Sequence, residues 1–188
     1  MNGESSLELL ARIRTGDRDA LDELIARYLP RLRRWAKGRL PGWARERDDT
    51  DDLVQDTVIR SLEKLEGFEP QHEAALQAYL RQAVLNRIRD LIRRAQRKPA
   101  FVPIDEDMTA EGESPLDQAI GAEALSRYDA GLSALRSEDQ EAIIARIELG
   151  YDYDELAAAL GKPSRAAARM AVRRALLRLA EKMRDARS

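Results

Sequence analysis

The chain has 188 residues, of which 44% are apolar and 35% charged, so it is long enough for one ordinary domain or two small ones. It has no cysteine, which excludes disulfides and thiolate metal sites and fits a reducing compartment. The N-terminal segment does not have the pattern of a signal peptide, and no stretch is apolar enough to span a bilayer. We therefore expect a cytoplasmic protein that does not insert into membranes.

The net charge of −2 conceals an uneven distribution of charge along the chain. Residues 81–98 hold seven cations and one anion, and residues 162–187 hold nine cations and two anions. Between them, residues 101–123 hold seven acids and no cation. Two basic segments on either side of an acidic one indicate two surfaces for an anionic partner.

The first half of the chain has the apolar spacing of helices and no window with the alternation of a strand. Helices are predicted over residues 7–14 and 18–40, and Pro30 is expected to kink or break the second one. Thr50 is a good N-cap for a third helix that should end at Gly67. These features predict an all-α fold.

A long basic helix is predicted next, over residues 78–98. On a helical wheel its apolar residues gather on one side, and Arg81 is the one cation that falls near them. The opposite side carries Asn86, Arg87, Asp90, Arg93, Arg94 and Arg97. By itself this pattern fits either a solvated face or a nucleic-acid surface. A membrane-surface helix is disfavoured because aromatic anchors are missing.

Residues 99–119 are predicted to form an extended acidic linker that contains three prolines. A second helical unit should follow over residues 120–188. Its predicted helices span residues 120–135, 138–149, 152–160 and 164–185.

The end of the chain reads as a helix-turn-helix, in the stretch "YDYDELAAALGKPSRAAARMAVRRALLRL". Gly161 is expected to make the turn, and Ser164 to cap the second helix. That helix would present Arg165, Arg169, Arg173 and Arg174 to a DNA groove. An αα-hairpin with no role in DNA binding is the alternative.

In their order along the chain, these parts resemble bacterial RNA polymerase sigma factors of the extracytoplasmic function (ECF) group. The stretches that carry the resemblance are "GDRDALDELIARYLPRLRRWA", "DDLVQDTVIRSLEKLEGF", "AYLRQAVLNRIRDLIRR", "LSALRSEDQEAIIARIELGYDYDELAAALG" and the tail after it. The chain departs from the family pattern at Tyr79, where Trp is usual, and at Arg136, where Pro is usual. The stretch "RAAARMAVRR" also differs, because the family usually carries Gly-Thr-Val-Lys-Ser-Arg there.

The resemblance implies two small helical domains joined by the flexible linker. Residues 1–98 would be sigma region 2, which binds the polymerase clamp and recognises and melts the −10 element, with the loop 67–75 forming part of a pocket for an extruded base. Residues 120–188 would be sigma region 4, which reads the −35 element.

The resemblance also implies the residues of each surface. Core polymerase would be bound by Asp51, Asp52, Leu53, Gln55 and Asp56. The −10 element would be bound and melted by Asn86, Arg87, Arg89, Asp90, Arg93, Arg94 and Arg97. The −35 element would be bound by Ser164, Arg165, Arg169, Arg173 and Arg174.

The implied partners are promoter DNA and RNA polymerase core, through the clamp of its largest catalytic subunits and its flap. An anti-sigma protein is a further partner that the group commonly has, and the acidic linker is expected to enter a cationic channel of the polymerase.

Other classes of function find less support in the sequence. The run "DDTDD" lacks the glycine and the closing glutamate of a calcium loop, so no metal or cofactor is predicted. The single histidine, His72, lies in a predicted loop, and the acids show no separate pattern for a nuclease, so no enzyme is predicted. The stronger alternative is a helix-turn-helix regulator that binds DNA without joining core polymerase.

Overall fold

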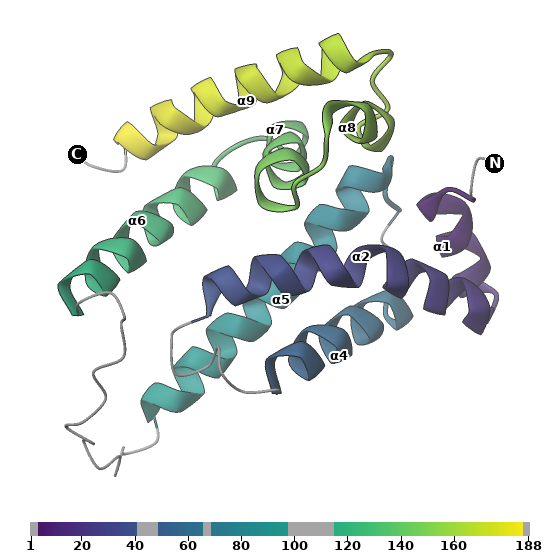
Figure 1. The fold of residues 1–188 in the computed structure, drawn as a ribbon, viewed down its shortest axis with the longest axis horizontal. Helices are drawn as coiled ribbons and strands as arrows, with labels where there is room; N and C mark the ends of the chain where they lie inside the picture. Colours follow the sequence, from purple (N-terminus) through teal and green to yellow (C-terminus); the bar gives the residue numbers. More distant parts are fainter. Residues whose placement is uncertain (1–3, 41–48, 66–68, 98–114, 186–188) are drawn as a thin grey trace.

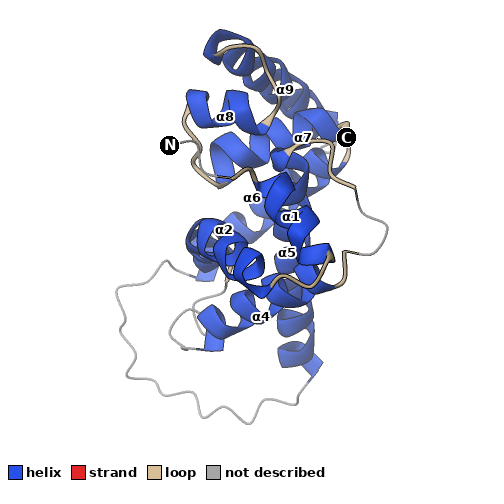
Figure 2. Ribbon diagram, turned by 90° about the vertical axis from the view of Figure 1, so that its right-hand side faces the viewer, coloured by secondary structure: helices blue, strands red, loops and turns tan. Residues whose placement is uncertain are grey.

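The computed structural model describes residues 4–40, 49–65, 69–97 and 115–185, and all regular structure in these ranges is helical (Figures 1 and 2). The first unit consists of α1 (Ser6–Arg14), α2 (Arg18–Arg39), α4 (Asp49–Glu63) and α5 (Glu73–Arg97). The second unit consists of α6 (Pro115–Ser133), α7 (Ser137–Ile143), the π-helix η1 (Ile144–Glu148), α8 (Tyr153–Ala159) and α9 (Arg165–Asp185). The expected all-α fold is confirmed.

Pro30 was predicted to kink or break this helix, and α2 runs on through it, so a break is wrong. Pro30 is exposed, whereas Leu29 beside it and Leu32 one half-turn later are buried. A proline inside a helix removes one backbone hydrogen bond and crowds the preceding turn. Packing of the buried face of α2 against α1, α4 and α5 outweighs that cost.

Helix α4 ends earlier than predicted, and helix α5 starts earlier than predicted. Helix α4 starts at Asp49, one residue before the predicted cap, and ends at Glu63 rather than Gly67. Helix α5 starts at Glu73, five residues before the predicted start at Ala78. Residues 66–68 lie outside the described residues.

The first helix of the second unit begins earlier than predicted. Helix α6 starts at Pro115, so residues 115–119 are helical rather than part of the linker. Residues 98–114, which hold most of the predicted linker, lie outside the described residues. The last predicted helix of this unit is confirmed closely, since α9 spans Arg165–Asp185.

The two units pack directly on each other, with α5 of the first unit facing the second unit (Figure 1). Helix α5 contacts α2 and α4 on one side and α7, η1 and α8 on the other. The buried apolar residues of both units form one continuous core, in which Leu80 of α5 and Ile143 of α7 are fully buried. Among the described residues, no helix is long and apolar enough to cross a membrane.

Candidate functional site

The residues expected to bind core polymerase lie on α4. Asp52 and Asp56 are exposed, and Asp56 is 3.6 Å from Arg60 one turn later. Leu53 is half-buried and packs against the core. The exposed side of α4 therefore presents carboxylates, while Leu53 helps to anchor the helix.

Two cations of α2 lie beside this acidic surface, and no sequence pattern indicated this contact. Arg33 donates a hydrogen bond of 2.8 Å from Nη2 to Oε1 of Gln55, and the Lys37 ammonium is 3.7 Å from Asp51 Oδ1. Since arginine can only donate, Gln55 accepts this bond through its carbonyl oxygen, and its amide nitrogen can act as a donor.

The basic helix α5 exposes Asn86 and Arg87. Gln82 donates a hydrogen bond of 2.9 Å from Nε2 to Oδ1 of Asn86, which orients the Asn86 amide. Asp90 accepts a hydrogen bond from Arg93, and this bond holds the pKa of Asp90 below its ordinary value. On this face, Arg87 can donate to DNA phosphates, and the Asn86 amide can pair with the edge of a base.

The remaining predicted residues of α5 do not all belong to one face. Arg94 is exposed, and the side chain of Arg97 lies outside the described residues. Arg89 is about half exposed, and its Nη2 lies 3.3 Å from Oδ2 of Asp129 in the second unit.

The helix-turn-helix is confirmed in its local geometry. Gly161 has a φ of +60°, where a side chain would be strained, and the backbone N–H of Lys162 donates to the Ala157 carbonyl at 2.8 Å. The backbone N–H of Ala167 donates to Ser164 Oγ at 3.2 Å, as expected for an N-cap. The turn and the cap together fix the angle between α8 and α9.

Helix α9 buries one stripe of small and apolar residues and exposes its arginines. The buried residues are Ala168, Val172, Ala175 and Leu179. Arg169, Arg173 and Arg174 are exposed, and Arg165 lies 3.3 Å from Asp154 of α8 at the surface. Helix α9 thus turns these arginines outward, as a recognition helix requires, whereas Arg178 donates to Asp139 of α7.

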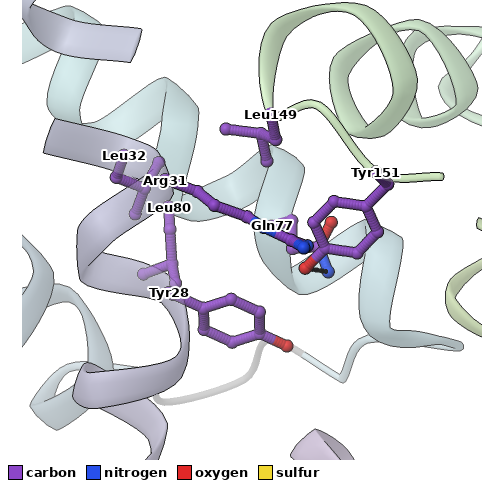
Figure 3. A pocket seen from close by; sticks show the side chains of 7 residues that line it. All are labelled: Tyr28, Arg31, Leu32, Gln77, Leu80, Leu149 and Tyr151. Atoms are coloured by element: carbon purple, nitrogen blue, oxygen red, sulfur yellow. Dashed lines mark hydrogen bonds between the residues drawn. The ribbon is translucent and has the colours of Figure 1, made fainter. Parts of the chain in front are cut away.

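The two units meet at a junction that no predicted site included. Gln77 of α5, which is 1% exposed, donates a hydrogen bond of 2.6 Å from Nε2 to the hydroxyl of Tyr151 (Figure 3). The Arg31 guanidinium of α2 lies 3.8 Å from the centre of the Tyr151 ring and 2.6 Å from Glu155. These contacts attach the segment before α8 to the first unit.

A second part of the junction is an ion cluster. Arg81 of α5 makes two hydrogen bonds of 2.8 Å to Glu148, and Arg39 of α2 makes one of 2.8 Å to Asp129. The position of Arg81 near the apolar side of the helical wheel was the sequence signal for this contact, because a buried cation requires a partner.

A histidine–carboxylate contact lies at the edge of the junction. The backbone N–H of Ala75 donates to Nδ1 of His72, which leaves the proton of a neutral ring on Nε2, 3.1 Å from Glu141 Oε2. Burial raises the pKa of Glu141 to about 7 and lowers the pKa of His72. Both shifts favour the neutral forms of the two groups.

The comparisons with known proteins decide the family. Residues 24–98 match the family model for Sigma-70 region 2. The chain is 31% identical over 157 residues to the ECF RNA polymerase sigma factor SigM of Mycobacterium tuberculosis, a match that covers 84% of this chain and 74% of the relative. The chain belongs to the ECF RNA polymerase sigma factors. The resemblance stated from the sequence is therefore confirmed.

Other RNA polymerase sigma factors match over similar lengths. SigD of Mycobacterium tuberculosis is 28% identical over 185 residues, covering 97% of this chain and 86% of the relative. The RNA polymerase sigma factor CnrH of Cupriavidus metallidurans is 28% identical over 170 residues, covering 86% of each chain. A solved structure of CnrH with the cytosolic domain of CnrY has a TM-score of 0.43 and 26% identity, and covers 98% of this chain and all of the other.

As an ECF sigma factor, this protein binds RNA polymerase and directs promoter recognition and transcription initiation. The helices that the family model matches are α2, α4 and α5. These helices carry the acidic surface of α4 and the basic face of α5.

Proposed function

We propose that promoter recognition is divided between the two units of this sigma factor. The first unit, up to residue 98, would bind core polymerase and recognise and melt the −10 element. The second unit would read the −35 element with α9. The observation that carries this division is that α5 and α9 each bury an apolar stripe and expose a separate set of arginines.

The acidic side of α4 is the proposed polymerase contact. Asp52 and Asp56 are exposed, and the amide group of Gln55 can donate as well as accept. A basic, polar clamp surface would complement these groups, and complementary charge sets orientation and association rate more than affinity. Asp51 and Leu53 would contribute mainly by position, because Asp51 faces Lys37 and Leu53 packs inward.

The exposed face of α5 is the proposed −10 contact. Arg87, Arg93 and Arg94 would neutralise phosphates, and Asn86 would hold a base that has left the stack. Unstacking a base costs a few kcal/mol, so melting requires a group that binds the extruded base. The Asn86 amide suits this role because Gln82 already orients it.

The N-terminal end of α9 is the proposed −35 contact. Arg169 and Arg173 are four residues apart and both exposed, so they lie on one side of the helix. Arginines at this position can donate two hydrogen bonds to a guanine edge or to a phosphate. Ser164 and Arg165 would contact the backbone beside the turn.

The proposal also includes where the protein acts, its role as a regulatory subunit, and a protein that would regulate it. The protein would act in the cytoplasm as a regulatory subunit with no catalytic residues of its own. An anti-sigma protein is a fitting regulator, because Met170 and Leu177 of α9 are 45% and 60% exposed and lie among the arginines. Such mixed apolar and cationic surfaces suit a protein partner as well as DNA.

Run-off transcription with core polymerase on a random promoter library tests the proposal. Transcripts that start from a common pair of sequence elements, and only when the protein is added to core, are the expected result. The matched control is the protein without core, incubated with the same duplex library. Specific binding there, without transcription when core is added, would instead indicate a helix-turn-helix regulator that acts alone.

A further inference from the structure

Three arginines of the first unit converge on two carboxylates of the second unit. Arg39, Arg81 and Arg89 form what we call the arginine cluster, and Asp129 of α6 lies 2.8, 3.3 and 3.3 Å from their guanidinium nitrogens. Glu148 of η1 lies 2.8 Å from Arg81 and 3.3 Å from Arg39. The side chains of Arg39 and Arg81 are 8% and 4% exposed, so the cluster is covered by the second unit.

The cluster has the composition of a site for an anion larger than a single carboxylate. Trp35 forms one wall, with the guanidinium groups of Arg39 and Arg81 5.2 and 5.1 Å from the ring centre. Three arginines face two carboxylates, which leaves one positive charge in excess. Arginine is suited to such a site because its planar fork binds carboxylates and phosphates in two-point contacts.

The packed arrangement cannot be the one that reads a whole promoter. The −10 and −35 elements are centred about 25 base pairs apart, or about 85 Å at ~3.4 Å per base pair. A packed chain of this length is only about 40 Å across. The two units must therefore separate on promoter DNA, and Asp129 and Glu148 then leave the arginine cluster.

We propose that the arginine cluster is a binding site for promoter DNA phosphates, which Asp129 and Glu148 occupy in the packed chain. The proposal rests on the proposed DNA face of α5. Arg89 connects the two surfaces, because it is half exposed, contacts Asp129, and is three residues from Asn86. DNA is favoured over an acidic protein surface because the cluster continues this basic face. Opening of the units and DNA binding are then coupled, since the carboxylates and the phosphates compete for the same arginines.

Fluorescence energy transfer can follow the separation of the units in the full chain. The natural sequence has no cysteine, so Ala26→Cys in α2 and Ala180→Cys in α9, both at exposed positions, provide two labelling sites. The test variant is Asp129→Asn with Glu148→Gln, which keeps the shapes of the side chains and removes both charges. Its charge-matched control is Glu123→Gln with Glu181→Gln, at two exposed carboxylates outside the cluster.

The binding probe is a fluorescein-labelled single-stranded 20-mer of deoxythymidine. The test variant should show lower energy transfer than the control and bind the probe at least tenfold more tightly. For the test variant, a plot of log affinity against log salt concentration should be steeper by about 2. The arginine cluster would neutralise three more phosphates, and each phosphate of single-stranded DNA contributes about 0.7 to the slope. Adding Arg81→Gln to the test variant should reverse most of the affinity gain while the units stay apart.

Several outcomes would overturn the proposal. A test variant that binds the probe no more tightly than the control would overturn it. A test variant with the same energy transfer as the control would also overturn it. A gain in affinity for core polymerase without a gain for the probe would assign the cluster to an acidic polymerase surface instead. Circular dichroism checks that the helices persist; should the double variant unfold, Asp129→Asn alone keeps the Arg81–Glu148 pair and should give a smaller gain of the same sign.

The proposed function can fail separately. If the unaltered protein with core polymerase transcribes no promoter, the division of promoter reading is wrong, whatever the energy transfer shows. If it transcribes and the test variant gains no affinity for the probe, only the phosphate site is wrong.

Discussion

The guanidinium of Arg81 makes two hydrogen bonds of 2.8 Å to the carboxylate of Glu148, from Nε to Oε2 and from Nη2 to Oε1. The two residues are 67 positions apart in the chain and lie in different units. Their side chains are 4% and 5% exposed, and Tyr128 donates a further hydrogen bond of 2.8 Å to Glu148. The pair is thus a desolvated, two-point contact that belongs to the packed arrangement of the units.

Removing both partners of this pair should cost less stability than the sum of the two single removals. Arg81→Met or Glu148→Met alone leaves a buried charge without its main partner, and each should lower the free energy of unfolding by about 3 kcal/mol. The double variant should lose clearly less than the sum, with a coupling energy of about 2 kcal/mol. Urea unfolding of the four proteins measures this cycle, and strictly additive losses would contradict it.

Two glycines of α6 should respond differently to the same substitution. A Cβ at Gly121 would meet no atom within 4 Å, whereas one at Gly131 would lie 3.0 Å from Met183 Cγ and 3.2 Å from Leu179 Cδ1 of α9. Gly121→Ala should raise stability by roughly 0.5–1 kcal/mol, because alanine loses less entropy in a helix. Gly131→Ala should be less stable than Gly121→Ala by about 1 kcal/mol. Thermal unfolding of the matched pair tests this, and equal midpoints would show that α9 can move aside.

The buried carboxyl of Glu141 should make stability depend on pH. Burial raises its pKa from 4.5 to about 7, so between these values the unfolded chain releases this proton and the folded chain keeps it. The contribution of Glu141 is therefore complete below pH 4.5 and is lost as pH rises through about 7. Relative to Glu141→Gln, the natural protein should lose about 2 kcal/mol between about pH 5 and 8.

His72 contributes a pH dependence of the opposite sign. Its pKa is lowered in the folded protein, so its contribution to stability falls as pH drops below 6.5. His72 is present in both the natural protein and the Glu141→Gln variant. Its contribution to the pH dependence of stability therefore cancels in the difference between them, provided that the glutamine of the variant contacts His72 as Glu141 does. Urea unfolding across the pH range is the measurement. A difference that stays constant with pH would show that Glu141 ionises normally in the folded protein.

Charge reversal on α4 should weaken polymerase binding without unfolding the protein. Asp52→Lys with Asp56→Lys places two cations where the proposed clamp contact needs anions, and both positions are exposed. Core affinity should fall at least tenfold, with the larger loss at low salt. Asp22→Lys with Glu23→Lys, at exposed acids of α2, is the control with the same change of charge. Equal core affinity of the two variants would refute the assignment of α4.

The two proposed DNA surfaces should fail at different steps of initiation. Arg169→Ala with Arg173→Ala should weaken the closed complex with duplex DNA upstream, by tenfold or more. Asn86→Ala should leave that complex nearly intact and reduce melting, because base capture matters only after the strands separate. Permanganate footprinting reports the melted region. A normal footprint for Asn86→Ala would contradict the division.

Much of the local structure was predictable from the sequence, because its causes lie within one or two helical turns. The apolar spacing predicted the helices of both units, and Gly161 and Ser164 predicted the turn and cap that the structure has. The exposed arginines of α5 and α9 followed from the same periodicity. The family resemblance was also readable, since it depends on the order of such local patterns.

The junction depended on the tertiary structure. Arg81 looked only like an irregular position in an amphipathic helix, yet its partners Asp129 and Glu148 are 48 and 67 residues away. The continuity of α2 through Pro30 likewise depends on packing against other helices rather than on its own residues. A sequence pattern reports which side of a helix is buried, because apolar spacing is local. It does not report which distant group meets a buried charge, because that pairing exists only once the units pack.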